Sequence, residues 1–501
     1  MKEEKVDLDK RQLTERRGLA IFVGIVAIIL GVNVLAVCIR VCTKKESARD
    51  MGDLINQDLQ EDILFVGDSQ VNFDILPMEL WQKYGYTSYV LHANNNGIAR
   101  SRAMLQLALQ YSNPKVVVLS TDQYWEESPI DTQIASYHEY ADDFPLTATK
   151  IKSTFQWLQE PSQRAEILFP FLIYHNRWKE LTRGDFYMKG SVLKGAALSY
   201  SISPIDFQDK PATDEPIMPE NGERNLIEIE KFIQECQDRN IDVLLLTLPM
   251  GLSTKRQSYL YELEEVADRY NIQYLNLVED CTIVDGMTDF KDAVHLNVSG
   301  AKKLTAYLGQ YLQEHYNLQN RMLDSDTAAL WNEDLEEYLE LKKQELINTQ
   351  DIQSFLLQCR DENLDIALYI KWNSNIYKDD QSCRLIENIA HLEKLDEARQ
   401  AGEDYFSFVD FGKGVIYETV ALQEEALDTS IGKIRVACAD DGNPELFCAS
   451  NEKNWFAQEG DREGDVRIAV FNRWTGEAIC TKVFDTQMVL KSEIDEEIKE
   501  K

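Results

Sequence analysis

Two short segments, far apart in the chain, carry the side chains that a serine nucleophile needs. The apolar run 63–66 is followed by Gly-Asp-Ser, ending at Ser69, and the second segment is Asp-Ala-Val-His, from Asp292 to His295. A serine hydroxyl is a weak nucleophile at neutral pH, so it needs an imidazole to take its proton and a carboxylate to orient that imidazole. Gly-Asp-Ser alone also fits a simple turn after a strand. The distant Asp-x-x-His favours catalysis, with Ser69 as nucleophile, His295 as general base and Asp292 as orienting carboxylate.

The elements that position these side chains are expected to be short buried strands alternating with helices. Runs of Val, Ile and Leu without polar alternation are typical of strands buried on both faces of a sheet, and they occur at 63–66, 89–91, 116–119, 243–248 and 274–277. Helical patterns lie between them, for example at 103–111 and 226–236. This alternation predicts an α/β layer fold with a mainly parallel sheet. Ligands of such sheets bind beyond the carboxyl ends of the strands, which is where Ser69 falls.

The two segments resemble the SGNH (GDSL-type) hydrolases, whose serine follows the first strand in a Gly-Asp-Ser block and whose Asp and His share a late Asp-x-x-His block. The resemblance implies a three-layer α/β domain over 62–320. It implies the same roles for Ser69, His295 and Asp292 as the residues themselves suggest. Neither a cofactor nor a metal is implied.

The resemblance also implies backbone donors for the oxyanion of a tetrahedral intermediate. One is the N–H of Ser69, and another comes from the loop after the strand at 89–91, where the family's glycine aligns with Asn95 by strand position and with Gly97 by residue type. The family's third donor is an Asn, but Asp122 stands at that position here.

An ionised carboxylate only accepts hydrogen bonds, so Gln123 is the expected substitute donor. The departure moves the resemblance toward membrane-anchored SGNH relatives that modify cell-surface polymers, including the D-alanyl transfer proteins and the alginate acetylation proteins.

Three further histidines are rival bases. His92, His138 and His175 are each placed singly, with no carboxylate at a fixed offset comparable to that between Asp292 and His295. Structural or surface roles are therefore expected for them.

A segment at about 137–220 interrupts the strand and helix rhythm and is predicted to be an inserted cap. Its aromatic stretch at 168–178 could stack on a sugar as a lid. We expect instead a helical cap whose aromatic rings are buried.

The uncharged run from Gly18 to Ile39 is close to the ~20 residues that cross a bilayer as a helix. Because basic residues precede it, the run predicts a cytoplasmic tail at 1–17, a transmembrane signal anchor at 18–41 and a stalk at 42–61. The rest of the chain would then lie outside the cytoplasm.

Composition narrows the function classes. The net charge of −34 argues against nucleic acid, whose phosphates require a basic surface. The nine cysteines show no Cys-x-x-Cys spacing, which argues against a zinc site. Cys438, Cys448 and Cys480 lie in one late region and could supply a disulfide in an oxidising compartment, with the pairing left open.

The last third of the chain is predicted to be a separate unit. An acidic helical connector at 321–358 leads to an α+β domain at 359–490 and a charged tail at 491–501. The domain is similar to the interleukin-like EMT inducer (GG) domain, on the strand at 464–472, the turn at 475–477 and the strand ending in Phe-Asp.

The counterpart of that family's later strand precedes this hairpin, at 366–372, so the order is expected to be circularly permuted. The resemblance implies carbohydrate binding. Trp372, Trp455 and Trp474 are the candidate stacking residues, although each also fits a core position.

These observations predict a membrane-anchored, extracytoplasmic serine esterase or O-acyltransferase acting on O-acyl groups, such as acetyl, of a cell-surface or exported polysaccharide. A membrane-bound acyltransferase is an expected partner. The same three side chains serve hydrolysis and transfer, so the acceptor stays open. The alternative is a catalytically inactive glycan-binding or scaffold protein of a polysaccharide-modifying complex, which the missing Asn favours.

Overall fold

The computed structural model describes residues 61–125, 134–183, 190–207, 215–278, 281–438, 443–448, 451–456 and 465–484, together with residues 23–25, 27, 28, 31, 51, 54, 55, 185 and 211. The predicted tails at 1–17 and 491–501 lie outside the described residues, and the predicted anchor and stalk lie almost wholly outside them. Within the described part of the chain, no helix combines the length and apolar character needed to cross a bilayer.

The chain divides into two compact units. One comprises 59–102, 112–127 and 192–501, and the other comprises 1–58, 103–111 and 128–191. The first unit contains both the parallel sheet and the carboxyl-terminal sheets.

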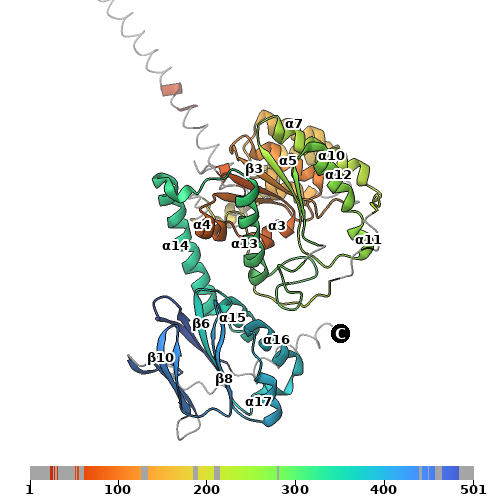
Figure 1. Cartoon of the computed structure of the whole chain (residues 1–501). Coiled ribbons are helices and arrows are strands. Elements are labelled where there is room, and N and C mark those ends of the chain that lie inside the picture. Colours follow the sequence, from red (N-terminus) through yellow and green to blue (C-terminus); the bar gives the residue numbers. More distant parts are fainter. Residues whose placement is uncertain are drawn as a thin grey trace, which may run out of the picture. The chain divides into compact units, whose positions relative to one another are not determined.

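Five strands form a fully parallel sheet in the first unit, with the order β2-β1-β3-β4-β5 (Figure 1). They are β1 (Ile63–Gly67), β2 (Ser88–His92), β3 (Val116–Ser120), β4 (Asp242–Thr247) and β5 (Gln273–Asn276). β1, at the second position, is buried along its whole length because helices cover both faces. The predicted α/β fold with a mainly parallel sheet is therefore confirmed.

Helices cover the two faces of this sheet (Figure 1). On one face Ile63 and Phe65 pack with α3 (Ser69–Asp74), α4 (Pro77–Tyr84) and α13 (Val298–His315). On the other face lie α10 (Gly222–Gln237) and α12 (Tyr261–Tyr270). The remaining helices between the strands are α5 (Ile98–Ala108) and α11 (Thr254–Gln257).

The other unit holds the first part of the predicted cap. It contains α6 (Ile134–Ala141), α7 (Ala148–Trp157), α8 (Pro161–Leu168), α9 (Phe171–Tyr174) and the 3-10 helix η3 (His175–Lys179). The expectation that its aromatic rings are buried is wrong, since Phe169, Phe171 and Trp178 are 55%, 44% and 64% exposed. Short helices broken by turns leave too little apolar surface to cover every ring.

Two helices connect the parallel sheet to the last third of the chain. α14 (Ser325–Asn348) follows the 3-10 helix η4 (Arg321–Leu323), and α15 (Ile352–Cys359) leads directly toward the next strand. Asp324 caps α14 by accepting the N–H of Asp326, and Asp351 caps α15 by accepting the N–H of Ser354.

The last third of the chain is built from two antiparallel sheets. The larger has the order β14-β13-β6-β7-β8 and the smaller β12-β11-β10-β9. Their strands are β6 (Leu364–Ile370), β7 (Tyr405–Asp410), β8 (Gly414–Val420), β9 (Glu425–Thr429), β10 (Gly432–Cys438), β11 (Pro444–Cys448), β12 (Asn451–Asn454), β13 (Val466–Asn472) and β14 (Ala478–Phe484). The helical elements are η5 (Asn375–Lys378), α16 (Asp380–Ala390) and α17 (Leu395–Ala401).

The central strand β6 packs between two layers, which explains why its residues read as a buried strand in the sequence. Ile366 and Leu368 pack on the helical side with α15 and α16, whereas Ala367 and Tyr369 pack against the smaller sheet. Because successive side chains point to opposite faces, a strand between two layers is mainly apolar on both faces, and the buried Asp365 is the polar residue of β6.

Several expectations for the carboxyl-terminal residues are changed by the structure. Cys438 and Cys480 are free thiols, so they do not pair with each other, and the side chain of Cys448 lies outside the described residues. Trp372 and Trp474 are exposed, at 56% and 73%, rather than in the core. Trp455 is half-buried and packs edge-on against Phe471.

Candidate active site

Ser69 lies at the first position of α3, immediately after the carboxyl end of β1. The side chain of Asp68 caps this helix by accepting the N–H of Gln70 at 2.8 Å. Gly67 is required here because a Cβ at this position would lie 2.7 Å from Cβ of Ser120 on the neighbouring strand β3. The turn therefore presents Ser69 with its backbone N–H at a helix start, where the first N–H groups have no partner inside the helix.

The structure brings Ser69, His295 and Asp292 together. The Ser69 Oγ lies 2.8 Å from Nε2 of His295, and Nδ1 of His295 lies 2.9 Å from both carboxylate oxygens of Asp292. The side chain of His295 is 16% exposed and that of Asp292 is 47% exposed. This chain of contacts can pass the Ser69 proton to the imidazole while the carboxylate holds Nδ1–H and stabilises the imidazolium that forms.

Helix α3 also holds the loop that carries His295. The Gln70 side-chain amide donates to the Val294 carbonyl at 2.8 Å, and Asp74 accepts the N–H of Leu296 at 2.8 Å. One short helix therefore carries Ser69 and fixes the backbone on both sides of His295. The distance between Ser69 and the imidazole of His295 is therefore set by one helix and its direct contacts to the His295 loop.

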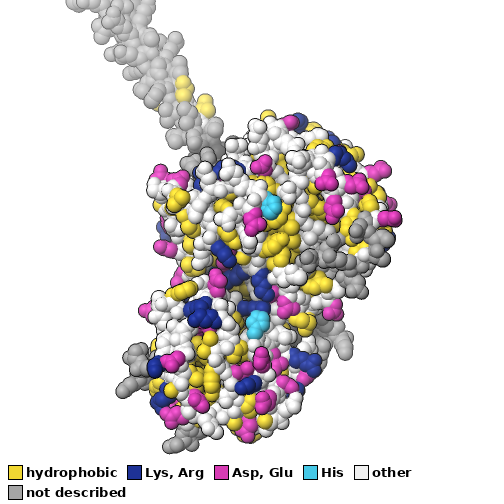
Figure 2. Space-filling view, viewed as in Figure 1, with side chains coloured by type: hydrophobic (Ala, Val, Ile, Leu, Met, Phe, Trp, Pro, Cys, Tyr) yellow, Lys and Arg dark blue, Asp and Glu magenta, His cyan; other side chains and the backbone are white. Residues whose placement is uncertain are grey.

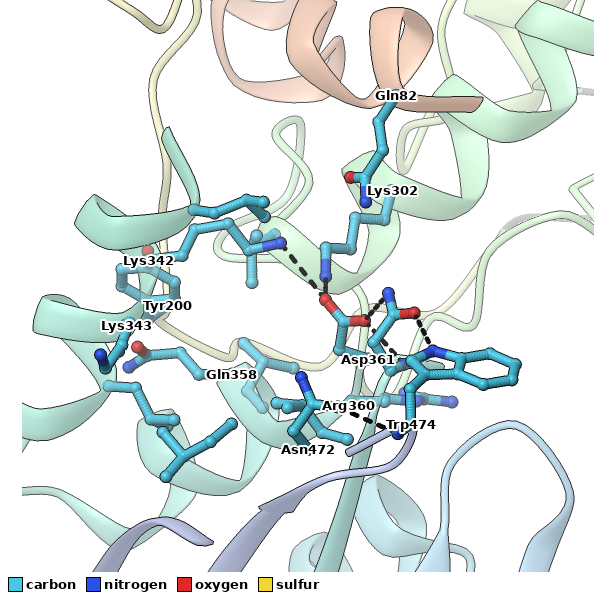
Figure 3. Close-up of a pocket in the computed structure, with 17 residues that line it drawn as sticks. Gln82, Tyr200, Lys302, Lys342, Lys343, Gln358, Arg360, Asp361, Asn472 and Trp474 are labelled. Atoms are coloured by element: carbon cyan, nitrogen blue, oxygen red, sulfur yellow. Dashed lines mark hydrogen bonds and ion pairs between the residues drawn. The ribbon is translucent and has the colours of Figure 1, made fainter. Parts of the chain in front are cut away.

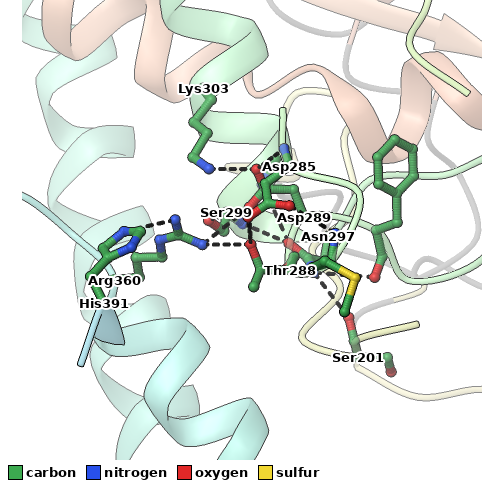
Figure 4. A network of polar contacts seen from close by, with 12 residues as sticks. Ser201, Asp285, Thr288, Asp289, Asn297, Ser299, Lys303, Arg360 and His391 are labelled. Atoms are coloured by element: carbon green, nitrogen blue, oxygen red, sulfur yellow. Dashed lines mark hydrogen bonds and ion pairs between the residues drawn. The ribbon is translucent and has the colours of Figure 1, made fainter. Parts of the chain in front are cut away.

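A polar network supports the same loop from the side of α13 (Figure 4). Asn297 caps α13 by accepting N–H groups of Ser299 and Gly300, and its amide donates to the Thr288 carbonyl at 2.8 Å. Asp289 is fully buried and contacts Lys303 at 2.5 Å and Arg360 at 3.3 Å. The loop between Asp289 and Asn297 is thus fixed at both ends.

The imidazole ring has an aromatic neighbour. The ring of Phe73 packs edge-on against His295, with the ring centroids 5.4 Å apart. The Lys291 ammonium lies 3.2 Å from the Phe73 ring centroid, so a cation covers one face of this ring. Phe73 therefore restricts the orientation of His295 without competing for its nitrogen atoms.

The electrostatics of Asp292 suit the orienting role. Burial acts to raise the pKa of Asp292, but hydrogen bonds from the Val294 N–H and from His295 outweigh it, so the pKa lies below its usual value. Asp292 Oδ1 accepts the N–H groups of Val294 and His295 at 3.0 and 2.9 Å. The group is therefore ionised at neutral pH and its position is set by the backbone.

Three buried carboxyl groups lie beneath the site. Burial raises the pKa of Asp68, and it raises the pKa values of Asp74 and Asp122 well above the usual value. Neighbouring carboxylates add to the shift of Asp74 and Asp122. Burial therefore disfavours the charged form of each of these three groups.

Asp122 has a structural role. It is fully buried, accepts the Leu248 N–H at 2.9 Å and contacts the Ser120 hydroxyl. Both contacts use Asp122 as an acceptor, and burial raises its pKa well above the usual value. Its hydrogen bonds tie the end of β3 to the residue after β4.

The expected oxyanion donors are distributed around the nucleophile turn. Asn95 and Gly97 flank Asn96, whose buried amide donates to the Gly67 carbonyl at 3.0 Å and so places their loop beside β1. The Gln123 amide donates to Asp68 at 2.5 Å, one residue before Ser69. At least one N–H of the Gln123 amide, the expected substitute oxyanion donor, is therefore bonded to Asp68.

The rival histidines do not contact Ser69 in the described structure. His92 lies 3.1 Å from the amide of Asn72, and His175 is exposed near the Leu172 carbonyl. The expectation that His138 lacks a carboxylate is wrong, because its Nδ1 lies 2.8 Å from Asp142, one helical turn later.

Sequence reasoning missed Gln70, Asp74 and Asn96, which hold the site together. One signal for Asp74 is present, since it is the single charged residue between Phe73 and the apolar pair before Pro77. A charge in an apolar run is expected to be paired or neutralised.

No family model matches the chain, and no curated protein matches it. Solved structures do show a likeness over about half of the chain. A protein described as an acylhydrolase from Bacteroides fragilis is 12% identical, with 54% of this chain and 98% of that chain covered and a TM-score of 0.28. A GDSL-like lipase from Bacteroides thetaiotaomicron is 10% identical, with 50% and 87% covered and a TM-score of 0.25. The SGNH-hydrolase family esterase AlinE4 is 12% identical, with 52% and 98% covered and a TM-score of 0.22.

Two substitutions of Asp74 test the support of the His295 loop. Asp74→Leu removes the acceptor of the Leu296 N–H and is expected to slow ester hydrolysis by about 10²-fold, because small misplacements of catalytic groups have large costs. Asp74→Asn keeps an acceptor of the same shape and should retain most of the activity. Steady-state kinetics on a chromogenic acyl ester measures both. Equal rates in the two variants would show that the contact does not position His295.

Asp74 also predicts a pH dependence of stability. Its pKa is raised in the native state by burial, so the native chain binds a proton that the unfolded chain releases above about pH 4. The free energy of unfolding should therefore fall as the pH rises from about 4 through the raised pKa. Asp74→Asn should weaken this fall in urea unfolding curves. An unchanged slope would contradict the assignment.

Proposed function

We propose that this chain is a serine carboxylester hydrolase or O-acyltransferase that acts on O-acyl groups of a cell-surface or exported polysaccharide. The single observation that carries the proposal is the continuous set of contacts from Ser69 Oγ through His295 to Asp292. A serine is activated in this way when it attacks a carbonyl carbon.

In the proposed reaction, Ser69 Oγ attacks the acyl carbonyl and Nε2 of His295 takes its proton. The oxyanion that forms would be held by the Ser69 N–H and by an N–H of the loop at Asn95 or Gly97. Collapse expels the sugar alkoxide, which takes the proton back from His295, and leaves an acyl-Ser69 ester. Water or a second sugar hydroxyl then attacks this ester, with His295 again as the base.

The proposed location and substrate rest on other features. The uncharged run at 18–39 supports a membrane anchor with the site outside the cytoplasm, and a membrane-bound acyltransferase would then be a natural acyl source. The exposed ring of Trp474 supports a sugar substrate, because it lines a pocket together with polar side chains.

One observation favours the inactive alternative, a glycan-binding or scaffold protein. The Gln123 amide is directed to Asp68, and Asp122 is directed to Leu248, so neither is committed to an oxyanion. Loss of one oxyanion donor typically costs about 10²–10³ in rate, which would slow the reaction without abolishing it.

The test is acetate release from O-acetylated polysaccharides by the full chain in detergent. We expect release from at least one acetylated polymer, and none from the same polymer with Ser69→Ala. Inclusion of a deacetylated acceptor polymer separates transfer from hydrolysis. Absence of turnover by correctly folded protein would favour the glycan-binding alternative, and turnover that survives Ser69→Ala would contradict the proposed nucleophile.

A further inference from the structure

A groove lies between α13 and α14 on one side and the start of β6 and the β13–β14 hairpin on the other. It consists of two adjoining cavities of about 360 and 490 Å³, which share Gln82, Lys302, Arg360, Asp361 and Asn363. We call it the basic groove. Its volume matches that of sites for ligands of several sugar rings or a small cofactor.

The groove is positively charged although the chain is strongly acidic. Six Lys and Arg side chains line it against three carboxylates, whereas the whole chain has a net charge of −34. The cations are Lys83, Lys302, Lys303, Lys342, Lys343 and Arg360. Figure 2 shows Lys and Arg side chains gathered in the middle of the visible face. A cleft of one sign raises the local concentration of ligands of the opposite sign.

Part of this charge is fixed in the floor of the groove (Figure 3). Asp361 contacts Lys302, and it lies 3.2 Å from Lys342, which also lies 3.2 Å from Glu79. Burial acts to raise the pKa of Asp361, but Lys302 and Lys342 hold it well below its usual range. These four groups compensate one another, so the excess positive charge comes from the surrounding cations.

Those surrounding cations are accessible or only partly compensated. Lys343 is 49% exposed and its partner Glu340 is 3.5 Å away and also exposed. Lys303 and Arg360 share the single carboxylate of Asp289. With Asp289 and Glu340 counted, the six cations face five carboxylates, so the groove keeps a small positive excess in a strongly acidic chain.

The groove also has the groups that recognise a sugar ring. Trp474 lines it with 73% of its surface exposed, and its Nε1–H donates to Oδ1 of Asn363 at 2.8 Å, which fixes the plane of the indole. Four side-chain amides line the same space and give it a polar wall, although several of their donors and acceptors are used within the protein. They are Gln82, Gln358, Asn363 and Asn472.

We propose that the basic groove binds an anionic stretch of the polysaccharide, with acidic groups on the Lys and Arg side chains and a sugar ring on Trp474. This rests on the proposed function and narrows its substrate to polymers that carry carboxylates or other acidic groups. Neither feature alone selects such a ligand: the charges would accept any anion, and the aromatic ring with amides would accept a neutral sugar.

The experiment measures binding of three hexamers to the full chain by calorimetry. Hexagalacturonate carries rings and charge, maltohexaose carries rings only, and hexaglutamate carries charge only. We expect hexagalacturonate to bind at least about tenfold more tightly than either of the others, with an affinity that falls as salt rises. Equal binding of hexaglutamate, or no binding of hexagalacturonate, would overturn the proposal.

Matched variants locate the site. Trp474→Ala and Lys343→Glu should each weaken hexagalacturonate binding about tenfold, since the first removes the aromatic anchor and the second replaces an attractive charge by a repulsive one. Trp372→Ala and Lys433→Glu change exposed residues of the same types outside the groove and should have no effect. Unchanged binding in both groove variants, with unfolding midpoints like the wild type, would overturn the location.

The binding result is independent of catalysis. Trp474→Ala and Lys343→Glu should hydrolyse a small chromogenic ester at the wild-type rate, because neither residue contacts Ser69 or His295. Failure of the proposed enzyme activity would appear as no ester hydrolysis in any variant, while hexagalacturonate binding would still succeed or fail by itself.

Discussion

Replacing His295 by alanine is expected to lower the rate of ester hydrolysis by about 10⁶, close to the loss expected for Ser69→Ala. The reason is that Ser69 Oγ has its proton acceptor, Nε2 of His295, at 2.8 Å, and loss of that base leaves an ordinary hydroxyl. Serine and base act as one unit, so the double variant should be no slower than either single variant. Steady-state kinetics on a chromogenic ester measures all three.

His138→Ala is the matched control for this prediction. His138 also has a carboxylate partner, Asp142 at 2.8 Å, but it contributes no contact to Ser69 in the described structure. We expect its ester hydrolysis to remain within a few fold of wild type. A loss in His138→Ala comparable to that in His295→Ala would contradict the assignment of the base.

Asp292→Asn is expected to lower the same rate by about 10⁴. An Asn in this place can turn its NH₂ toward Nδ1 of His295, which then becomes an acceptor, and Nε2 would carry the proton when it faces Ser69. The remaining Asn oxygen can still accept the Val294 and His295 N–H groups that Asp292 accepts now. The loop should therefore keep its fold, and the loss should reflect the wrong tautomer.

Circular dichroism and the thermal midpoint check that Asp292→Asn folds normally. A folded variant that loses less than about tenfold in rate would show that Asp292 does not orient the base, because even a single weakened hydrogen bond to a charged group is worth about 1.5 kcal/mol. Asp285→Asn, which changes a carboxylate before this loop, should retain most of the activity.

The sheet and the three reacting side chains were predictable because their signals are local. Strands such as β1 are apolar at every position when both faces are buried, and Gly67 with Ser69 follows directly from the end of that strand. The Asp-x-x-His spacing likewise puts Asp292 and His295 in one turn.

The supporting contacts were not predictable because they join distant parts of the chain. Gln70 reaches Val294 and Asp74 reaches Leu296 across more than two hundred residues, and nothing in the sequence around Val294 or Leu296 indicates these partners. The short strands β9 and β12 were missed for a different reason: both are polar edge strands of the smaller sheet, without the apolar pattern that marks buried strands.

The state of a buried acid also depends on its surroundings rather than on its residue type. Asp122 is an acceptor, as its residue type indicates, but the rise of its pKa comes from full burial and neighbouring carboxylates that the sequence around it does not reveal. The exposure of Trp474 is also not apparent from sequence. A tryptophan two residues after Asn472 in a hairpin turn fits a core position equally well. Only packing shows that its ring faces the basic groove.

The most direct measurement for the central claim is covalent labelling of the full chain with a fluorophosphonate, followed by peptide mapping. An activated serine reacts with this probe, whereas an ordinary surface hydroxyl does not. We predict one adduct, on Ser69, that is absent in Ser69→Ala and in His295→Ala and unchanged in Ser325→Ala, which alters an exposed serine at the start of α14. Labelling that persists in Ser69→Ala, or an adduct on a different residue, would contradict the account.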